Sequence, residues 1–195
     1  MFALHNFSYS SAHFFRSCAG ILVPSNFCAN FYRQSLGIAC TSILSPILEA
    51  AVRCNPLPGH RQFVTFVNPS PHNGVYVFAA IALLLQKTRP DIPLLVVESR
   101  ADSEWLLYAC PSLAESTNAY RMSTTQDPRE FYQVTKIMLI PSVWQESFGR
   151  VAAESMMNGI PVIASNRGAL PETIGSASET LELPAEITPP AVQIA

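Results

Sequence analysis

Short runs of apolar residues recur along the second half of the chain, and segments with a helical pattern separate them. The runs of strand length are FVTFV (63–67), IPLLVVE (92–98), KIMLI (136–140) and PVIAS (161–165). They are nearly apolar throughout instead of alternating, which is typical of strands buried on both faces of a parallel sheet. Strands of this kind alternating with helices predict a doubly wound α/β domain with helices on both faces of the sheet.

The helical segments between these runs have recognisable ends. VYVFAAIALLLQKTRP predicts a helix over 75–90 that a proline ends, and ADSEWLLYA predicts a short helix over 101–109. The segment 148–158 predicts another helix, closed by Gly159. The longest apolar run, 75–85, falls well short of the roughly 20 residues that a membrane span needs, so it predicts a buried helix.

The two ends of the chain are less regular. Near the N-terminus, GILVPSNF predicts a short buried strand over 21–23, with Ser25 as the N-cap of a following helix, ANFYRQSLG (29–37). The last stretch, LELPAEITPPAVQIA (181–195), has three prolines and no helical period. It predicts a tail with nothing to pack against.

Charge and cysteine usage narrow the classes of partner and compartment. The net charge of −2 provides no basic field, which disfavours nucleic acid and anionic membranes as partners. The five cysteines are odd in number and include no CxxC pair, so neither a zinc site nor a disulfide framework is expected. The opening residues lack a basic segment followed by an unbroken apolar run, so we expect no signal peptide and a cytoplasmic protein.

Candidate chemistry is concentrated in PSVWQESFGRVAAESMMNGIPVIASNRGALPETIG, residues 141–175. This segment begins at the carboxyl end of a predicted strand, the edge where open α/β sheets bind ligands. The backbone N–H groups of Ser147, Phe148 and Gly149 precede the predicted helix, and together with the helix dipole they suit a phosphate or sugar oxygen. Gly149 keeps the backbone accessible at this point.

Two glutamates, Glu146 and Glu154, flank this turn. Along a helix their spacing separates them by at most about 12 Å, more than the about 5 to 9.5 Å between the paired acids of a glycosidase. Such a spacing better serves hydroxyl groups at the two ends of one polyol ligand. An alternative is that Glu146 only favours the helix N-terminus electrostatically and Glu154 is a solvated helix residue.

The same segment resembles the donor-binding signature of retaining glycosyltransferases of the family-4 type, glycosyl transferases group 1, which have the two-domain GT-B fold. The resemblance rests on the Glu-x7-Glu pair Glu146 and Glu154, on Phe148-Gly149 after the first glutamate, and on GIPVIAS after the helix. NRGALPETIG continues it. Weaker likenesses follow the same order along the chain, in PSNFCANFYRQSLGI, FVTFVNPSPHNG and RPDIPLLVVESR.

The resemblance implies a role for each of these residues. Glu154 binds the ribose hydroxyls of a nucleotide-sugar, and Glu146, with the backbone of Ser147, Phe148 and Gly149, holds the sugar hydroxyls and the distal phosphate. The family works without a metal, so no cofactor is expected besides the nucleotide-sugar donor. Its transition state is oxocarbenium-like, so the hydrogen-bond donors that stabilise the leaving diphosphate contribute most to catalysis.

Further roles follow from positions outside this segment. His5, in LHNFSY, resembles a family histidine near the transferred sugar, with a capping or packing histidine as the alternative. STTQDPREFY (123–132) resembles the lining of the nucleobase pocket, or is a surface connection. Trp144 is expected to pack under the donor loop, with a stacking role as the alternative.

The loop VNPSPHNGV departs from the family pattern. An arginine and then a lysine before glycine clamp the diphosphate in the family, but here Asn68 and Pro69 stand near the first position and Asn73 precedes Gly74. A neutral amide gives up a charge-assisted contact, which is roughly twice as strong as a neutral one. Arg100 partly compensates, or is a solvent-facing loop arginine.

By resemblance, residues 1–53 are the end of an N-terminal acceptor domain, 54–182 are a Rossmann-like donor domain, and 183–195 are a proline-rich tail, so the chain resembles an enzyme truncated at both ends. One hypothesis is a glycosyltransferase that moves a hexose-type sugar, with retention, to an unidentified acceptor. Another is a nucleotide-sugar-binding module without turnover, or one that needs a separate chain supplying the acceptor domain. A third is a fragment with no independent role.

Overall fold

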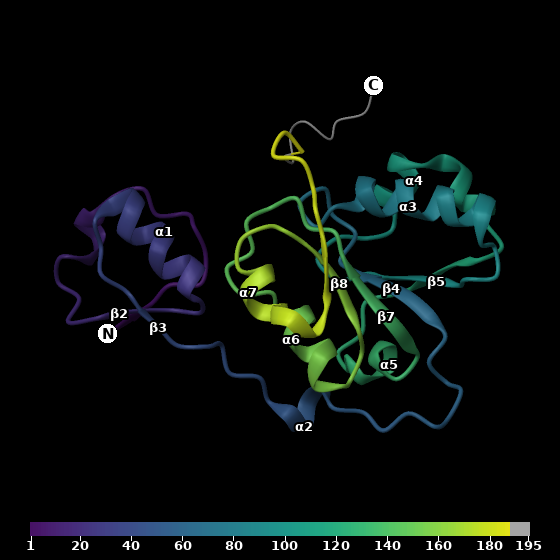
Figure 1. Cartoon of the computed structure of the whole chain (residues 1–195), viewed down its shortest axis with the longest axis horizontal. Helices are drawn as coiled ribbons and strands as arrows, with labels where there is room; N and C mark the ends of the chain where they lie inside the picture. Colours follow the sequence, from purple (N-terminus) through teal and green to yellow (C-terminus); the bar gives the residue numbers. More distant parts are fainter. Residues whose placement is uncertain (188–195) are drawn as a thin grey trace.

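The computed structural model describes residues 1–187, and in them the backbone forms two parallel sheets (Figure 1). The larger sheet has the strand order β6-β5-β4-β7-β8-β9, and every neighbouring pair is parallel. Its strands are β4 (Phe63–Val67), β5 (Leu94–Val97), β6 (Ala119–Met122), β7 (Thr135–Ile140), β8 (Val162–Ser165) and β9 (Glu179–Leu181). The sheet confirms the doubly wound α/β fold. The four apolar runs form β4, β5, β7 and β8, whereas β6 and β9 were not predicted.

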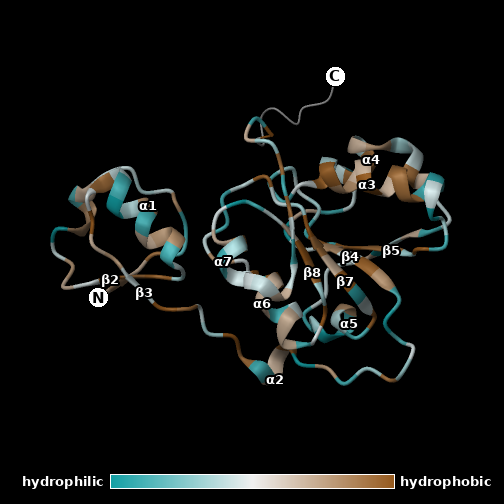
Figure 2. Ribbon diagram, in the orientation of Figure 1, coloured by the Kyte–Doolittle hydropathy of each residue, from teal (hydrophilic) through white to brown (hydrophobic). Residues whose placement is uncertain are grey.

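Helices cover both faces of the larger sheet. On one face lie α3 (Val75–Thr88), α4 (Glu104–Ala109) and the 3₁₀ helix η2 (Pro111–Glu115), and on the other lie α5 (Arg129–Tyr132), α6 (Arg150–Met157) and α7 (Leu170–Ile174). Figure 2 shows the apolar residues gathered in the central strands and on α3. The helix α3 buries Phe78 and Ala82 but leaves Leu84 61% exposed, so it is covered on one face only. Within residues 1–187, no helix is long and apolar enough to cross a membrane.

The smaller sheet lies near the N-terminus and has its own apolar core. It consists of β1 (Phe2–Ala3), β2 (Ile21–Val23) and β3 (Thr41–Ser42), with the 3₁₀ helix η1 (Ala12–Phe15) and the helix α1 (Asn26–Leu36). The predicted N-cap is confirmed, because Ser25 Oγ accepts the Cys28 N–H at 3.0 Å. Gly37, at φ 66°, ends α1 in the left-handed conformation that favours glycine.

Two side chains of the larger domain bind the smaller sheet's elements directly. Glu172, on α7, accepts the backbone N–H groups of Asn26 and Phe27, each at 2.8 Å. Its carboxylate therefore lies at the N-terminus of α1, where the helix dipole favours a negative charge. Ser147 Oγ donates to the His5 carbonyl, and Ser25 Oγ donates to the Ser147 carbonyl, both at 2.7 Å. The loop after β7 is therefore bound to the N-terminal part through both the side chain and the carbonyl of Ser147.

The segment that joins the two sheets packs against the larger one. It contains the short helix α2 (Glu49–Val52), whose Val52 is buried in the core formed by α5, α6 and α7 (Figure 1). Asn158, at the end of α6, donates from Nδ2 to the Val52 carbonyl at 3.1 Å and accepts the Cys54 N–H at 2.9 Å. The division at residues 53 and 54 stays a prediction.

The end of the chain packs further than expected. Leu181 lies in β9, which pairs with β8, and Leu183 is 8% exposed. Arg167 also donates to the carbonyls of Pro184 and Ile187. The expectation of a tail without packing partners is therefore wrong for residues 181–187, and its remainder, 188–195, lies outside the described residues.

Candidate functional site

The candidate site lies where β4 and β7, which are parallel neighbours, both end. The loops that leave these strands touch: the N–H groups of Val143 and Trp144 donate to the His72 carbonyl at 3.0 and 3.3 Å. Gly74 makes this approach possible, because at φ 86° any Cβ would run into the Pro141 carbonyl. Glu146 and the NPSPHNG loop therefore lie at the same edge of the sheet.

A cleft of 490 Å³ opens at this edge. It is lined by residues of the segments 66–73, 99–100 and 140–152, together with His5 and Ser45 from the N-terminal part. His5, Asn73, Arg100, Glu146, Ser147, Phe148 and Gly149, all named from the sequence, line it. Gly74 and Glu154 do not.

Glu146 is held in the cleft by the loop that follows β8. Its carbonyl accepts the Ala169 N–H at 2.7 Å, and Gly168, at φ 61°, lies so close to its backbone that no Cβ fits there. The Ser142 hydroxyl donates to Oε1 at 3.1 Å. Burial raises the pKa of Glu146 above its ordinary value, and the Ser142 hydrogen bond opposes the shift. This carboxyl group is consequently easier to protonate than one in water.

The turn after Glu146 presents backbone donors. Gly149 takes φ 87° as the N-cap of α6, which starts at Arg150, two residues later than predicted. Within residues 1–187, the N–H groups of Ser147, Phe148 and Gly149 have no protein acceptor. Three unpaired donors before a helix N-terminus are suited to bind an anion.

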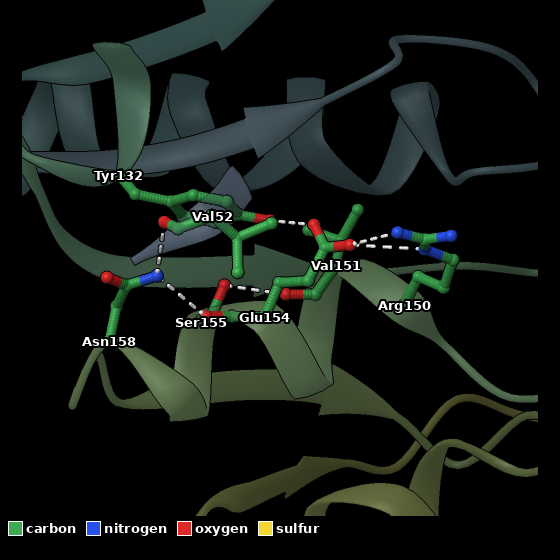
Figure 3. A network of polar contacts seen from close by, with 7 residues as sticks. All are labelled: Val52, Tyr132, Arg150, Val151, Glu154, Ser155 and Asn158. Atoms are coloured by element: carbon green, nitrogen blue, oxygen red, sulfur yellow. Dashed lines mark hydrogen bonds and ion pairs between the residues drawn. The ribbon is translucent and has the colours of Figure 1, made fainter. Parts of the chain in front are cut away.

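Glu154, on α6, is 7% exposed, and Figure 3 shows its carboxylate between Tyr132 and Arg150. Tyr132, on α5, donates from its hydroxyl to Oε2 at 2.8 Å, and Arg150 donates to Oε1 from Nε at 3.1 Å and from Nη2 at 2.8 Å. Burial, and then the neighbouring Glu154, raise the pKa of Tyr132, so its hydroxyl stays a donor. The alternative of a solvated Glu154 is wrong.

Sequence reasoning did not identify Arg150 and Tyr132 as partners of Glu154. The (i, i+4) spacing of Arg150 and Glu154 on one helix was a visible signal. Tyr132 gave none, because the fold brings it to Glu154 from another helix.

The loop between β4 and α3 is tied to itself and to the loop after β5. Asn73 Nδ2 donates to the Asn68 carbonyl at 2.9 Å, and Asn68 Oδ1 accepts the Ala101 N–H at 2.9 Å. Asn68 has φ 61°, a conformation that asparagine tolerates better than most residues. Asn73 therefore contributes a neutral amide to the cleft, while the side chain of Arg100 beside it is exposed.

Other features frame the site. The Trp144 side chain is 49% exposed and its ring packs edge-on against His72 at 5.0 Å, so it lies on the loop surface and not under it. A second hollow, of 420 Å³, is lined by Tyr76, Asp102 and residues of α4, away from Glu146. Among residues 1–187, no group of three His, Cys, Asp or Glu side chains is placed to hold a metal ion.

The six-stranded parallel sheet, covered by helices on both faces and with this cleft at the carboxyl ends of its strands, is a Rossmann-like α/β domain. The family model of glycosyl transferases group 1 matches residues 56–184, and the chain belongs to that family. Among curated proteins it is 26% identical, over 176 residues, to the lipopolysaccharide 1,2-N-acetylglucosaminetransferase of Salmonella typhimurium, covering 80% of this chain and 46% of that protein. The chain thus spans about half the length of this relative.

Solved structures show the same fold. Anabaena Alr3699/HepE, in complex with UDP and glucose, superposes with a TM-score of 0.68 at 18% identity, covering 89% of this chain and 52% of that one. A glycosyltransferase from Rickettsia africae superposes with a TM-score of 0.69 at 18% identity, covering 92% and 54%. At these identities the likeness concerns the fold alone.

Proposed function

We propose that this chain binds a nucleotide-sugar in the cleft at the carboxyl ends of β4 and β7 and takes part in transferring its sugar, a hexose, to an acceptor with retention of configuration. The observation that carries the proposal is the turn after β7. There, the half-buried Glu146 lines the same cleft as Ser147, Phe148 and Gly149, whose N–H groups have no acceptor within residues 1–187. Family membership supports the reaction class.

Each group has a part in the proposed complex. The N–H groups at the start of α6 donate hydrogen bonds to the distal phosphate, whose negative charge grows as the bond to the sugar breaks. Glu146 binds sugar hydroxyls, which hydrogen-bond to its carboxyl group. Glu154 binds the ribose hydroxyls. Arg100, at the rim of the cleft, adds a positive charge that attracts the diphosphate. No metal takes part in this mechanism.

The N-terminal part supplies the other wall. His5 and Ser45 line the cleft, and the bond from Ser147 Oγ to the His5 carbonyl holds that wall against the donor turn. In the proposal, His5 approaches the transferred sugar. The acceptor is held by a separate chain that supplies an acceptor domain.

A second candidate function is donor binding without turnover. One observation favours it: the loop 68–74 brings neutral Asn73 to the cleft, and the phosphates lose a charge-assisted contact there. Binding and turnover are therefore measured separately.

The test is calorimetric titration with UDP, GDP and ADP and with their glucose and N-acetylglucosamine conjugates, followed by an assay for released sugar. We expect one base to bind, and the Glu146→Ala variant to lose about tenfold in affinity for the sugar conjugate but little for the free diphosphate. Glu104→Ala, on α4, is the control. A wild type that binds none of these ligands contradicts the proposal, and binding without released sugar favours the second candidate.

A further inference from the structure

Arg150 occupies the boundary between the cleft and the buried Glu154. Its side chain is 61% exposed, whereas that of Glu154 is 9% exposed, and the two form an (i, i+4) ion pair of 2.8 Å. Arg150 lines the cleft and Glu154 does not. Figure 3 shows the guanidinium group on one side of the Glu154 carboxylate and Tyr132 on the other. A ligand in the cleft therefore meets Arg150 before it meets Glu154.

The hydrogen bonds of Glu154 are already largely taken. Oε1 accepts two N–H groups from Arg150, and Oε2 accepts the Tyr132 hydroxyl. A carboxylate oxygen has room for about two donors. A pair of ribose hydroxyls consequently needs at least one of the positions that Arg150 holds in the empty site.

Few cations line the cleft. The loop 68–74 contributes neutral Asn68 and Asn73, and the arginines that line the cleft within residues 1–187 are Arg100 and Arg150. Arg150 directly follows Gly149 and so stands next to the unpaired N–H groups of the turn. A planar guanidinium group binds phosphate as well as it binds carboxylate, by two parallel hydrogen bonds.

We infer that Arg150 exchanges partners: it pairs with Glu154 in the empty site and moves to the diphosphate when a donor binds. This inference rests on the proposed function. The exchange leaves the Glu154 carboxylate hydrogen-bonded, because the ribose hydroxyls replace the guanidinium there while Tyr132 keeps its bond. Arg150 thereby supplies the positive charge that the loop 68–74 lacks.

The experiment compares a nucleoside diphosphate with its nucleoside, using UDP and uridine first, then GDP with guanosine and ADP with adenosine. Arg150→Gln should bind the diphosphate about tenfold more weakly and the nucleoside equally or more tightly, because Glu154 is uncovered. Arg150→Lys keeps the charge and should retain most of the diphosphate affinity. Arg53→Gln is the control. It removes another (i, i+4) ion pair, that of Arg53 with Glu49 at the end of α2, and should change neither affinity.

Two further readouts separate exchange from a merely structural pairing. The slope of the diphosphate affinity against salt should fall in Arg150→Gln but not in Arg150→Lys. If Arg150→Gln and Arg150→Lys weaken diphosphate and nucleoside alike, Arg150 only orients Glu154 and the inference is wrong. If the wild type binds a diphosphate and Arg150→Gln binds it equally, the exchange fails while the proposed function stands. If the wild type binds no nucleotide, both fail.

Discussion

Two loops reach the same cleft from neighbouring strands, and they carry different chemistry. The loop after β7 brings the half-buried Glu146 and three backbone N–H groups that have no acceptor within residues 1–187. The loop after β4 brings Asn68 and Asn73, whose side chains form hydrogen bonds with backbone groups of the loops, the Ala101 N–H and the Asn68 carbonyl. The contrast teaches that two neighbouring loops of one cleft can differ in chemistry: one brings a carboxyl group and backbone donors, and the other brings neutral amides.

The largest expected effect comes from Gly74, where the two loops meet. Gly74→Ala places a Cβ against the Pro141 carbonyl at a positive φ, so it should lower the free energy of unfolding by at least about 3 kcal/mol. Gly37→Ala is the matched control: its φ is also positive, but nothing lies within 4 Å of the added atom. The control should cost about 1 kcal/mol. Equal losses in urea unfolding would mean that the loops are not in contact.

Glu154 tests the second glutamate of the signature. Glu154→Ala should weaken binding of the preferred nucleoside by about 1.5 to 3 kcal/mol, the value for hydrogen bonds to a charged group. Because Glu154 also binds Tyr132 and Arg150, the melting temperature must be measured in parallel, with Glu154→Gln as the variant that still accepts from Tyr132. Equal affinity of Glu154→Ala and the wild type in calorimetry would refute the ribose role.

Asn73 tests the neutral loop. Asn73→Lys should tighten binding of the diphosphate by about 1 kcal/mol at low salt, and by less as salt rises, because the gain is electrostatic. The nucleoside should gain less than the diphosphate. Asn73→Met, which also loses the bond to the Asn68 carbonyl, separates the new charge from the lost amide. If Asn73→Lys and Asn73→Met bind the diphosphate equally at low salt, the loop does not face the phosphates.

The smallest effect concerns the pH dependence of stability. Because the pKa of Glu146 is raised in the folded state, the folded state binds more protons than the unfolded one between the two pKa values, and stability falls as pH rises through that window. Glu146→Gln should therefore stabilise the protein at neutral pH but not at acidic pH. Glu98 is the control of opposite sign: hydrogen bonds from Ser103 lower its pKa, so Glu98→Gln should destabilise at neutral pH. A pH-independent effect of Glu146→Gln on unfolding would contradict the assignment.

The inner strands of the larger sheet could be predicted from the sequence, and its edge strands could not. The strands β4, β5, β7 and β8 lie inside the sheet and are buried on both faces, which produces continuous apolar runs. The strands of the larger sheet that were missed, β6 and β9, are its two edges, where exposed residues such as Tyr120 and Glu179 replace the apolar run.

The candidate site likewise has a part that could be predicted from the sequence and a part that could not. Its local part, from Glu146 to Glu154, follows from a strand end, a glycine and a helix start. The contacts made by distant residues left no spacing signal: Tyr132 reaches Glu154 from α5, and Glu172 reaches the start of α1 across 146 positions. Such pairs depend on the packing of elements, which the local pattern of residues does not encode.

The most direct test is a crystal structure of the protein with the nucleoside diphosphate that binds best. We predict that the ribose hydroxyls contact Glu154, that the distal phosphate receives the N–H groups of Ser147, Phe148 and Gly149, and that Arg150 has turned from Glu154 to the phosphates. A nucleotide found instead in the hollow beside Tyr76 and α4, or one that leaves the 490 Å³ cleft empty, would contradict the assignment of the donor site.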